Sequence, residues 1–180
     1  MKKIIKAFFK EIVPIIIGIL IALYINNWNE DRKDKNYIDR ISISIHKELT
    51  ETNNDIVDYL LKQKVLIDSF DFYLKDNQVS LEMILKKSEG IYIPKIRINS
   101  WKAISNSKIE LMDYEKTSTL VDIEEQKELL RMKAEKLIDF IFSNYRETGE
   151  DKKEFVKMLI SEIISTERSL QKDIGKIINK

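Results

Sequence analysis

Cysteine is absent from this 180-residue chain, and histidine occurs once, at His46. Without Cys the chain forms no disulfide, offers no thiolate ligand for zinc and has no thiol nucleophile. A single His supplies neither a histidine-rich zinc site nor the paired Glu-x-x-His motifs of a di-iron bundle, because both need several imidazoles. We therefore expect His46 to be structural or solvated, and we expect no metal site and no cofactor.

Glycine and proline are also scarce, with four Gly and two Pro in the chain. No Gly-rich phosphate loop, Gly-x-Ser-x-Gly elbow or His-Glu-x-x-His helix occurs, so the common nucleotide-binding, hydrolytic and metalloprotease motifs are missing. The chain has 31 basic and 30 acidic residues, so it lacks the excess of positive charge with which nucleic-acid-binding proteins contact phosphates. We assign no catalytic residue and expect a protein that is not an enzyme and binds no nucleic acid.

The longest uncharged run, Ile12–Ile25, reads IVPIIIGILIALYI. Its fourteen residues make about 21 Å of helix, against a hydrocarbon core of roughly 30 Å. Ala7 to Phe9 on one side and Trp28 on the other extend the apolar surface to about 33 Å. Ten Ile, Leu and Val residues favour the bilayer by about 3 to 6 kcal/mol, and no central charge opposes them.

We predict that residues 1–28 form an uncleaved membrane anchor. A run of this length also suits a cleaved signal sequence or a buried helix of a soluble domain. The bulky Ile25–Trp28 segment argues against cleavage, which needs small residues just past the apolar run. The positive charges before the run are the terminal amine, Lys2, Lys3, Lys6 and Lys10, and those after it are Arg32, Lys33, Lys35 and Arg40. Their slight bias predicts a cytoplasmic N-terminus, with the rest of the chain on the other side.

Two features of the anchor are candidate contact sites. Gly18, Ala22 and Asn26 recur at steps of four, which places two small residues and an amide on one face of a helix. This face is the candidate for packing against a second copy, although Gly is also common in membrane helices in general. Trp28 is the candidate interface anchor, because an amphipathic ring suits headgroup depth. Alternatively, Trp28 and the neighbouring Asn residues bind a partner or a lipid.

The anchor resembles a known segment. Glu11 and Ile12, Gly18 to Leu23 and Asn26 to Glu30 resemble the opening of an uncharacterised family of bacterial single-span membrane proteins, a domain of unknown function. Lys10 stands where that family usually has Gly. The resemblance implies a Gram-negative inner-membrane protein with a helical extracytoplasmic domain, and it implies no activity.

Residues 29–180 carry helical patterns. From Ile38 to Tyr73, apolar residues recur in alternating steps of four and three, which predicts a long amphipathic helix over 29–75. Further helices are predicted from a Ser80 cap to Lys87, from a Ser100 cap over 101–112, from Asp113 or Asp122 to Arg146, and from an Asp151 cap to the end of the chain. Between them, residues 91–98, IYIPKIRI, form either an extended arm or one edge strand.

Two further features have alternatives. The acidic residues Glu48, Glu51, Asp55 and Asp58 follow one another at helical spacing, and we interpret them as a solvated face because a calcium loop needs Gly and alternating ligands. Trp101 is predicted to be a core residue by its size, and it is the candidate partner or ligand site if it is accessible.

The predicted fold is all-α, with one N-terminal transmembrane helix followed by a long amphipathic helix and an antiparallel helical bundle. The predicted domains are an anchor, 1–28, and a helical extracytoplasmic domain, 29–180. The predicted function is that of a membrane-anchored, non-enzymatic interaction or scaffolding protein of the cell envelope, with an envelope protein or a second copy as partner. The alternative is a helical bundle that senses a small ligand. A pocket with convergent polar groups near Trp101 favours sensing, whereas a filled core and an exposed apolar stripe favour partner binding.

Overall fold

The computed structural model describes the backbone of residues 2–179 and the side chains of residue 10 and residues 12–179. Throughout residues 2–179 the chain is helical or irregular, without a strand, so the all-α prediction is confirmed. The α-helices and the one 3-10 turn are α1 (Lys2–Phe72), α2 (Leu81–Lys87), α3 (Asn99–Ser105), η1 (Ile109–Leu111), α4 (Tyr114–Ser143) and α5 (Glu150–Ile178).

The chain divides into two compact units, Met1–Ser42 and Ile43–Lys180, and α1 contributes to both. The predicted division at residue 28 rests on the expected membrane interface and stays a prediction. The side chains of Lys2, Lys3, Lys6 and Glu11 lie outside the described residues.

Helix α1 is 71 residues long because almost nothing in its sequence interrupts a helix. Pro14 lies inside it, where the missing N–H removes one backbone hydrogen bond, an arrangement that membrane helices tolerate. The helix ends at Phe72, three residues before the predicted end. There Asp76 Oδ1 accepts a hydrogen bond from the Gln78 N–H at 2.9 Å, which offers the backbone a turn in place of a further helical bond.

Two of the predicted helix caps are confirmed. Ser80 Oγ accepts a hydrogen bond from the Met83 N–H at 3.4 Å and begins α2. Asp113 Oδ1 accepts one from the Lys116 N–H at 3.0 Å and begins α4, so Asp113 rather than Asp122 is the start of that helix. Both side chains satisfy N–H groups that a first helical turn leaves without partners.

Two other predicted caps are wrong. Helix α3 begins at Asn99 rather than at Trp101, and it ends at Ser105 instead of reaching Met112. Ser100 lies inside its first turn, where the N–H is satisfied by a carboxylate that is distant in the sequence, described below. Helix α5 begins at Glu150 after Gly149, so Asp151 is a residue of the helix and not its cap. At Ser100 the local capping pattern competes with a tertiary partner, which a local pattern does not record.

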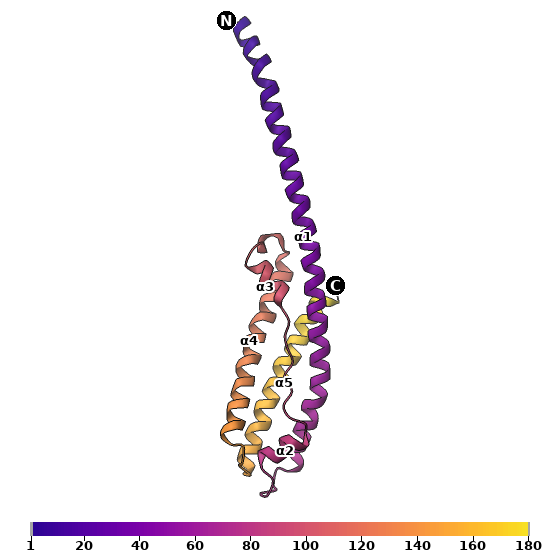
Figure 1. Ribbon diagram of the computed structural model, residues 1–180, viewed down its shortest axis with the longest axis vertical. Helices are drawn as coiled ribbons and strands as arrows, with labels where there is room; N and C mark the ends of the chain where they lie inside the picture. Colours follow the sequence, from indigo (N-terminus) through magenta and orange to yellow (C-terminus); the bar gives the residue numbers. More distant parts are fainter. Residues whose placement is uncertain (1, 180) are drawn as a thin grey trace. The chain divides into compact units, whose positions relative to one another are not determined.

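In the second unit, the part of α1 that follows Ser42 runs beside α5, and α5 runs beside α4 (Figure 1). The contacts between α1 and α5 join His46 to the Ile178 carbonyl, Gln63 to Glu167, and Asp71 to Lys157. The contacts between α4 and α5 join Gln126 to Asp173, Lys133 to Thr166, and the ring of Phe140 to that of Phe155.

The core is formed by the apolar stripes that the helical spacing predicts. Along α1 the inner face, defined as the side whose residues are buried between Ile45 and Phe70, also carries two buried polar residues, Thr52 and Gln63. The apolar members of the core from the three long helices are Ile45, Leu49, Ile56, Leu66 and Phe70 of α1, Leu120, Ile123, Leu130, Ala134, Leu137 and Ile141 of α4, and Val156, Leu159, Ile160, Ile163, Leu170 and Ile174 of α5.

Residues 91–98, called the arm from here on, are an irregular extended segment and not an edge strand. Glu89 and Gly90 before it have φ angles of 62° and 99°, a left-handed conformation that Gly adopts freely and that reverses the chain after α2. Pro94, Ile96 and Ile98 of the arm are buried, so the arm is part of the second unit's interior.

Ile56→Ala should lower the free energy of unfolding by about 2 to 5 kcal/mol, because it removes fully buried methylene groups and leaves a cavity. The next residue, Val57, is 46% exposed, and Val57→Ala should change that free energy by less than about 0.5 kcal/mol. Urea unfolding of the full chain in detergent, followed by circular dichroism, measures both. Equal losses would contradict the assignment of the inner face of α1.

Candidate functional site

The anchor carries large apolar side chains on every side of α1. Ile15, Leu20 and Ile25 are between 56 and 61% exposed, although they point in different directions around the helix. By length and composition, α1 is the one helix within the described residues that is able to cross a membrane. A helix that is apolar all round is typical of a membrane span or of a deeply buried core, and these side chains are not buried by the chain itself.

Gly18, Ala22 and Asn26 all lie on the exposed surface of α1. A Cβ atom added at Gly18 would meet nothing within 4 Å, so the chain itself makes no use of the missing side chain. Asn26 Nδ2 donates a hydrogen bond to Glu30 Oε1 at 3.2 Å, one turn further along the helix. The proposed face is therefore open at Gly18 and Ala22, while the amide of Asn26 already has a partner within the helix.

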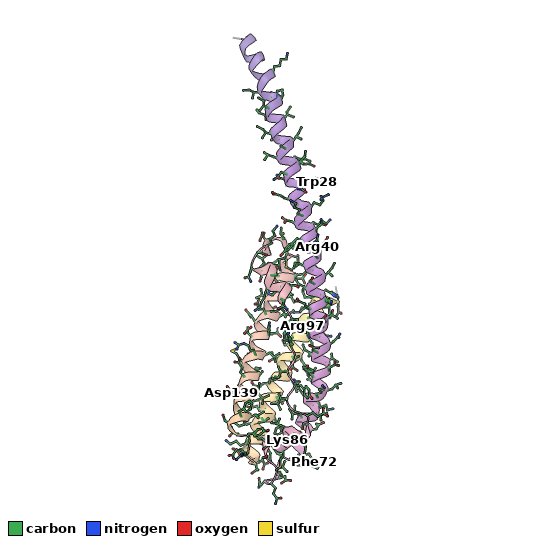
Figure 2. The ribbon with its side chains drawn as sticks, in the orientation of Figure 1. Trp28, Arg40, Phe72, Lys86, Arg97 and Asp139 are labelled. Carbon is green, nitrogen blue, oxygen red and sulfur yellow. The ribbon has the colours of Figure 1, made fainter. Side chains whose placement is uncertain are left out.

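Trp28 projects from the same helix, as does Arg40 further along (Figure 2). The guanidinium of Arg32 lies over the indole ring of Trp28, 5.4 Å from the ring centroid. This cation–π contact keeps a positive charge beside the apolar ring. A ring and a cation in contact form an amphipathic pair, as expected for a side chain at the boundary between lipid and water.

Trp101 lies in the other unit, inside the core. It is 2% exposed, and its indole N–H donates a hydrogen bond to Glu124 Oε2 at 2.7 Å. Lys102 adds an ion pair to the same carboxylate at 3.7 Å. Burial and a satisfied N–H are what a packing role requires. The geometry thus favours the core interpretation of Trp101 over a ligand site.

The acidic residues of α1 hold the arm and are not simply a solvated face. Arg97 Nη1 donates a hydrogen bond to Asp55 Oδ2 at 2.5 Å, and Arg97 Nε lies 3.5 Å from Glu51 Oε2, so these partly exposed carboxylates also bind the arm. The Arg97 N–H also donates to Thr52 Oγ1 at 3.0 Å. Figure 2 labels Arg97, which lies where the arm passes α1.

Glu48 completes this set of contacts. Its carboxylate accepts hydrogen bonds from the N–H of Ser100 at 3.1 Å and from the Ser100 hydroxyl at 3.1 Å. It therefore satisfies an N–H in the first turn of α3 that no local side chain caps. The sequence signal for this site was an acidic helix face together with Arg97 in an irregular segment, but nothing local indicated that they meet.

A second polar contact lies deeper, on the inner face of α1. Gln63 and Glu167 are 2% and 0% exposed, and Gln63 Nε2 donates to Glu167 Oε1 at 2.8 Å. The same Nε2 donates to the Tyr92 carbonyl of the arm at 2.9 Å. Burial raises the pKa of Glu167 to about 7, and the hydrogen bond from Gln63 offsets part of that rise. The helical pattern from Ile38 to Tyr73 covers Gln63, but nothing in the sequence identified Glu167 as its partner.

Lys153 is a buried cation with a structural role. Its Nζ donates hydrogen bonds to the carbonyls of Tyr73 and Asp76 at 2.9 and 2.7 Å, just past the end of α1. A cation is favourable at the C-terminal end of a helix, where carbonyl groups lack partners. Burial lowers the pKa of Lys153 from the ordinary Lys value.

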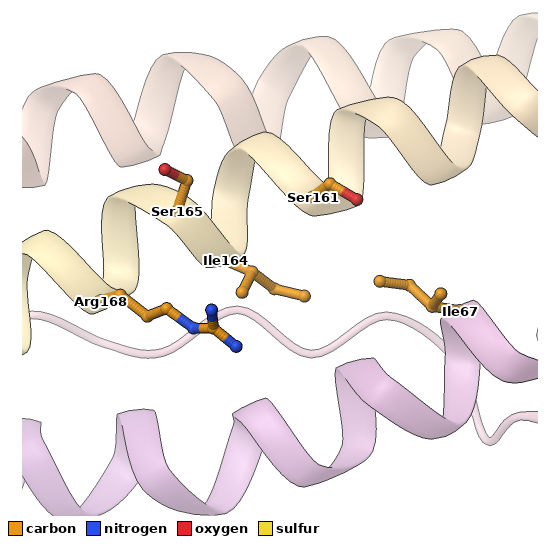
Figure 3. A pocket seen from close by; sticks show the side chains of 5 residues that line it. All are labelled: Ile67, Ser161, Ile164, Ser165 and Arg168. Carbon is orange, nitrogen blue, oxygen red and sulfur yellow. The ribbon is translucent and has the colours of Figure 1, made fainter.

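Several shallow hollows occur on the surface, and Trp101 lines none of those described here. One, of about 360 Å³, lies between α1 and α5. There Ile67 and Ile164 point toward each other and Arg168 extends toward α1, whereas the hydroxyl of Ser165 points away from it (Figure 3). Another, of about 370 Å³, is lined mostly by apolar side chains, namely Leu85, Gly90, Ile91, Ile138, Ile141, Phe142 and Tyr145.

No group of three or more His, Cys, Asp and Glu side chains that would hold a metal ion occurs in the part of the chain that the structure describes. His46 lies at the surface with its Nε2 3.2 Å from the Ile178 carbonyl oxygen. His46 is therefore a residue that contacts the end of α5, in agreement with the structural or solvated role that the sequence predicts.

No protein-family model matches the chain, and no curated protein or solved structure is significantly similar to it. The resemblance of the anchor to a family of bacterial single-span membrane proteins therefore stays a prediction. The functional argument rests on the residues and their geometry.

Arg97→Gln should lower the free energy of unfolding by about 1 kcal/mol, because it removes charged hydrogen bonds that join two segments distant in the sequence. The matched control is Arg131→Gln, since Arg131 is exposed and pairs only with Glu128 and Glu135 of its own helix. The control should leave stability unchanged within error. Urea midpoints of the full chain measure both variants, and an unaffected Arg97 variant would show that the guanidinium contacts do not stabilise the arm.

Proposed function

We propose that the chain is a membrane-anchored, non-enzymatic interaction or scaffolding protein of the bacterial cell envelope. The observation that carries this proposal is the exposed apolar surface of α1 from Val13 to Trp28. In water, a continuous apolar surface of this extent would drive aggregation. In a bilayer, the ten Ile, Leu and Val residues of the run Ile12–Ile25 contribute about 3 to 6 kcal/mol in favour of insertion.

The proposed placement is a single span of the inner membrane, with a cytoplasmic N-terminus and residues after Trp28 in the periplasm. Trp28 with Arg32 supports an interface at that point. A shallow hollow of about 280 Å³ follows along α1, lined by Lys33, Asn36, Tyr37 and Arg40, so polar and charged side chains follow the proposed interface. The Lys-rich segment 2–10 directly before the apolar run supports the orientation.

For residues 43–180 we propose an antiparallel bundle of the second part of α1 with α4 and α5. Successive residues of α1 contact residues of α5 in the reverse order: His46 contacts Ile178 at the end of α5, and Asp71 contacts Lys157 near its beginning. This order supports an antiparallel arrangement. Side chains fill the core, so other molecules would contact the surface of the domain. This supports partner binding as the function.

The alternative is a domain that senses a small ligand, and one observation favours it. The apolar hollow beside Phe142 and Tyr145, about 370 Å³, falls within the size range of ligand sites. Its lining lacks the several convergent polar groups that give a ligand its orientation, and Trp101 is not part of it. Partner binding is therefore the better supported function.

The orientation is tested by reporters fused after Lys180. A periplasm-only reporter should be active and a cytoplasm-only reporter inactive, because the Lys-rich end is retained in the cytoplasm. The same pair of fusions placed after Lys10 serves as the control and should give the reverse result. Activity of only the cytoplasmic reporter after Lys180 would overturn the proposed orientation.

We also propose association of two copies through the face of Gly18, Ala22 and Asn26. Gly18→Ile should abolish the signal of a membrane two-hybrid assay, because a large side chain keeps the two backbones apart where small residues let them approach. The space around Gly18 is open within the chain, so the substitution does not disturb the single helix. Ile16→Leu is the control and should keep the signal. Equal signals from both variants would show that this face is not an interface.

A further inference from the structure

Gln63 and Glu167 connect three segments of the second unit at one buried point. Gln63 belongs to α1 and Glu167 to α5, and the two donor hydrogens of the Gln63 amide serve the Glu167 carboxyl and the Tyr92 carbonyl of the arm. Both side chains are almost completely shielded from water. The contact therefore depends on how these few polar atoms are paired, because buried polar atoms without partners are costly.

Two atoms of this pair have no partner. They are Gln63 Oε1 and Glu167 Oε2, one from each side chain, and both are buried. Both are acceptors when Glu167 is ionised, so neither satisfies the other. A proton on Glu167 Oε2 makes that oxygen a donor, and Gln63 Oε1 remains an acceptor. Gln63 Oε1 belongs to the amide whose Nε2 already donates to the Glu167 carboxyl group. An acid and an amide then exchange two hydrogen bonds in place of one.

We propose that Glu167 is protonated in the folded chain at mildly acidic pH, that its acid proton is donated to Gln63 Oε1, and that loss of this proton weakens the junction of α1, the arm and α5. The second unit would thus respond to pH through one carboxyl group. The proposal concerns this unit by itself and does not depend on the membrane placement or on the partner.

The ionisable groups on the surrounding elements are engaged with other partners. On α1, Lys62 lies over the rings of Tyr59 and Tyr92, 5.7 and 4.2 Å from their centroids. On α4, Lys133 donates to the Glu162 carbonyl and to the hydroxyl of Thr166.

The charged neighbours of Glu167 along its own helix leave its charge unbalanced as well. Asp173 is bound by Gln126 and Lys176, and Arg168 is exposed at the surface. The influences on the pKa of Glu167 are accordingly burial, which raises it to about 7, and the Gln63 hydrogen bond, which lowers it. Among the described residues, none of the cations named above pairs with Glu167, so burial favours the protonated form.

The direction of the effect follows from proton linkage. The folded chain binds the Glu167 proton more tightly than the unfolded chain does, so stability from this group is complete below the ordinary carboxyl pKa of 4.5 and falls as the pH rises to about 7. Above that range, the loss is complete and the contribution is constant. From pH 5.5 to 8.5 the unfolding equilibrium constant should rise on the order of 30-fold from this group alone.

The test uses the full chain in detergent micelles, unfolded with urea at several pH values between about 5.5 and 8.5. The wild-type chain should lose stability as the pH rises from about 5.5, and the profile should level off near pH 7. Glu167→Gln should remove this loss, because the Gln amide accepts from Gln63 Nε2 and donates to Gln63 Oε1 without a titrating proton. Glu154→Gln is the matched control, since Glu154 is an exposed carboxyl of the same helix, and it should keep the wild-type profile.

A second measurement does not depend on a variant. The side-chain carboxyl carbon of Glu167, followed by NMR in the wild-type chain, should titrate near pH 7. A titration at or below the ordinary range would overturn the proposal, and it is the result expected if a buried water donates to both unpartnered oxygens and keeps Glu167 ionised. A flat wild-type stability profile, or an unchanged slope in Glu167→Gln, would overturn it as well.

Discussion

A helix presents all of its sides to its surroundings, and α1 satisfies this constraint in two different ways along its length. From Val13 to Trp28 its large apolar side chains are exposed in every direction, whereas from Ile45 to Phe70 they are buried along one side. Propensity makes both parts helical, because neither contains more than isolated Gly or Pro. The first part requires an apolar environment that the chain does not provide. The buried side of the second part is the surface against which α5 and the arm pack.

The arm is the segment that makes the second unit more than three helices. The arm is neither a strand nor a helix, so its backbone N–H and C=O groups depend on side chains for hydrogen bonds. Helix α1 supplies them at Thr52, which accepts from the Arg97 N–H, and at Gln63, which donates to the Tyr92 carbonyl. This explains why the inner face of α1 carries polar residues at two places where an apolar residue would pack as well against a helix. It also explains why removing one of them leaves a buried group without a partner.

The polar contacts of α1 are of two electrostatic kinds, an ion pair at the surface and, among the described residues, a buried carboxyl group without a cation. Arg97 with Asp55 and Glu51 lies at the boundary with water, where charges remain ionised and the interaction is modest. Glu167 lies where water does not reach, and the charged form is disfavoured because nothing of opposite sign accompanies it. A carboxyl group thus holds segments together in both places, once as an anion and once as an acid.

The sequence by itself determined the helices, the apolar anchor and the buried stripes of α1, α4 and α5. These depend on local spacing, on residue size and on the scarcity of Gly and Pro, all of which are visible in a single chain. It also located the caps at Ser80 and Asp113, because those side chains bond only three residues away.

Only the tertiary structure decided that Glu48 reaches the first turn of α3, that Arg97 meets Asp55, and that Glu167 meets Gln63 across 104 residues. The predicted cap at Ser100 was wrong for this reason, and the prediction of a solvated acidic face on α1 missed the contacts with Arg97 and Ser100. An acidic residue on a helix has the same local pattern whether it faces water, an arginine or a buried amide. Its partner is set by which segments the fold brings together, and local periodicity carries no information about that.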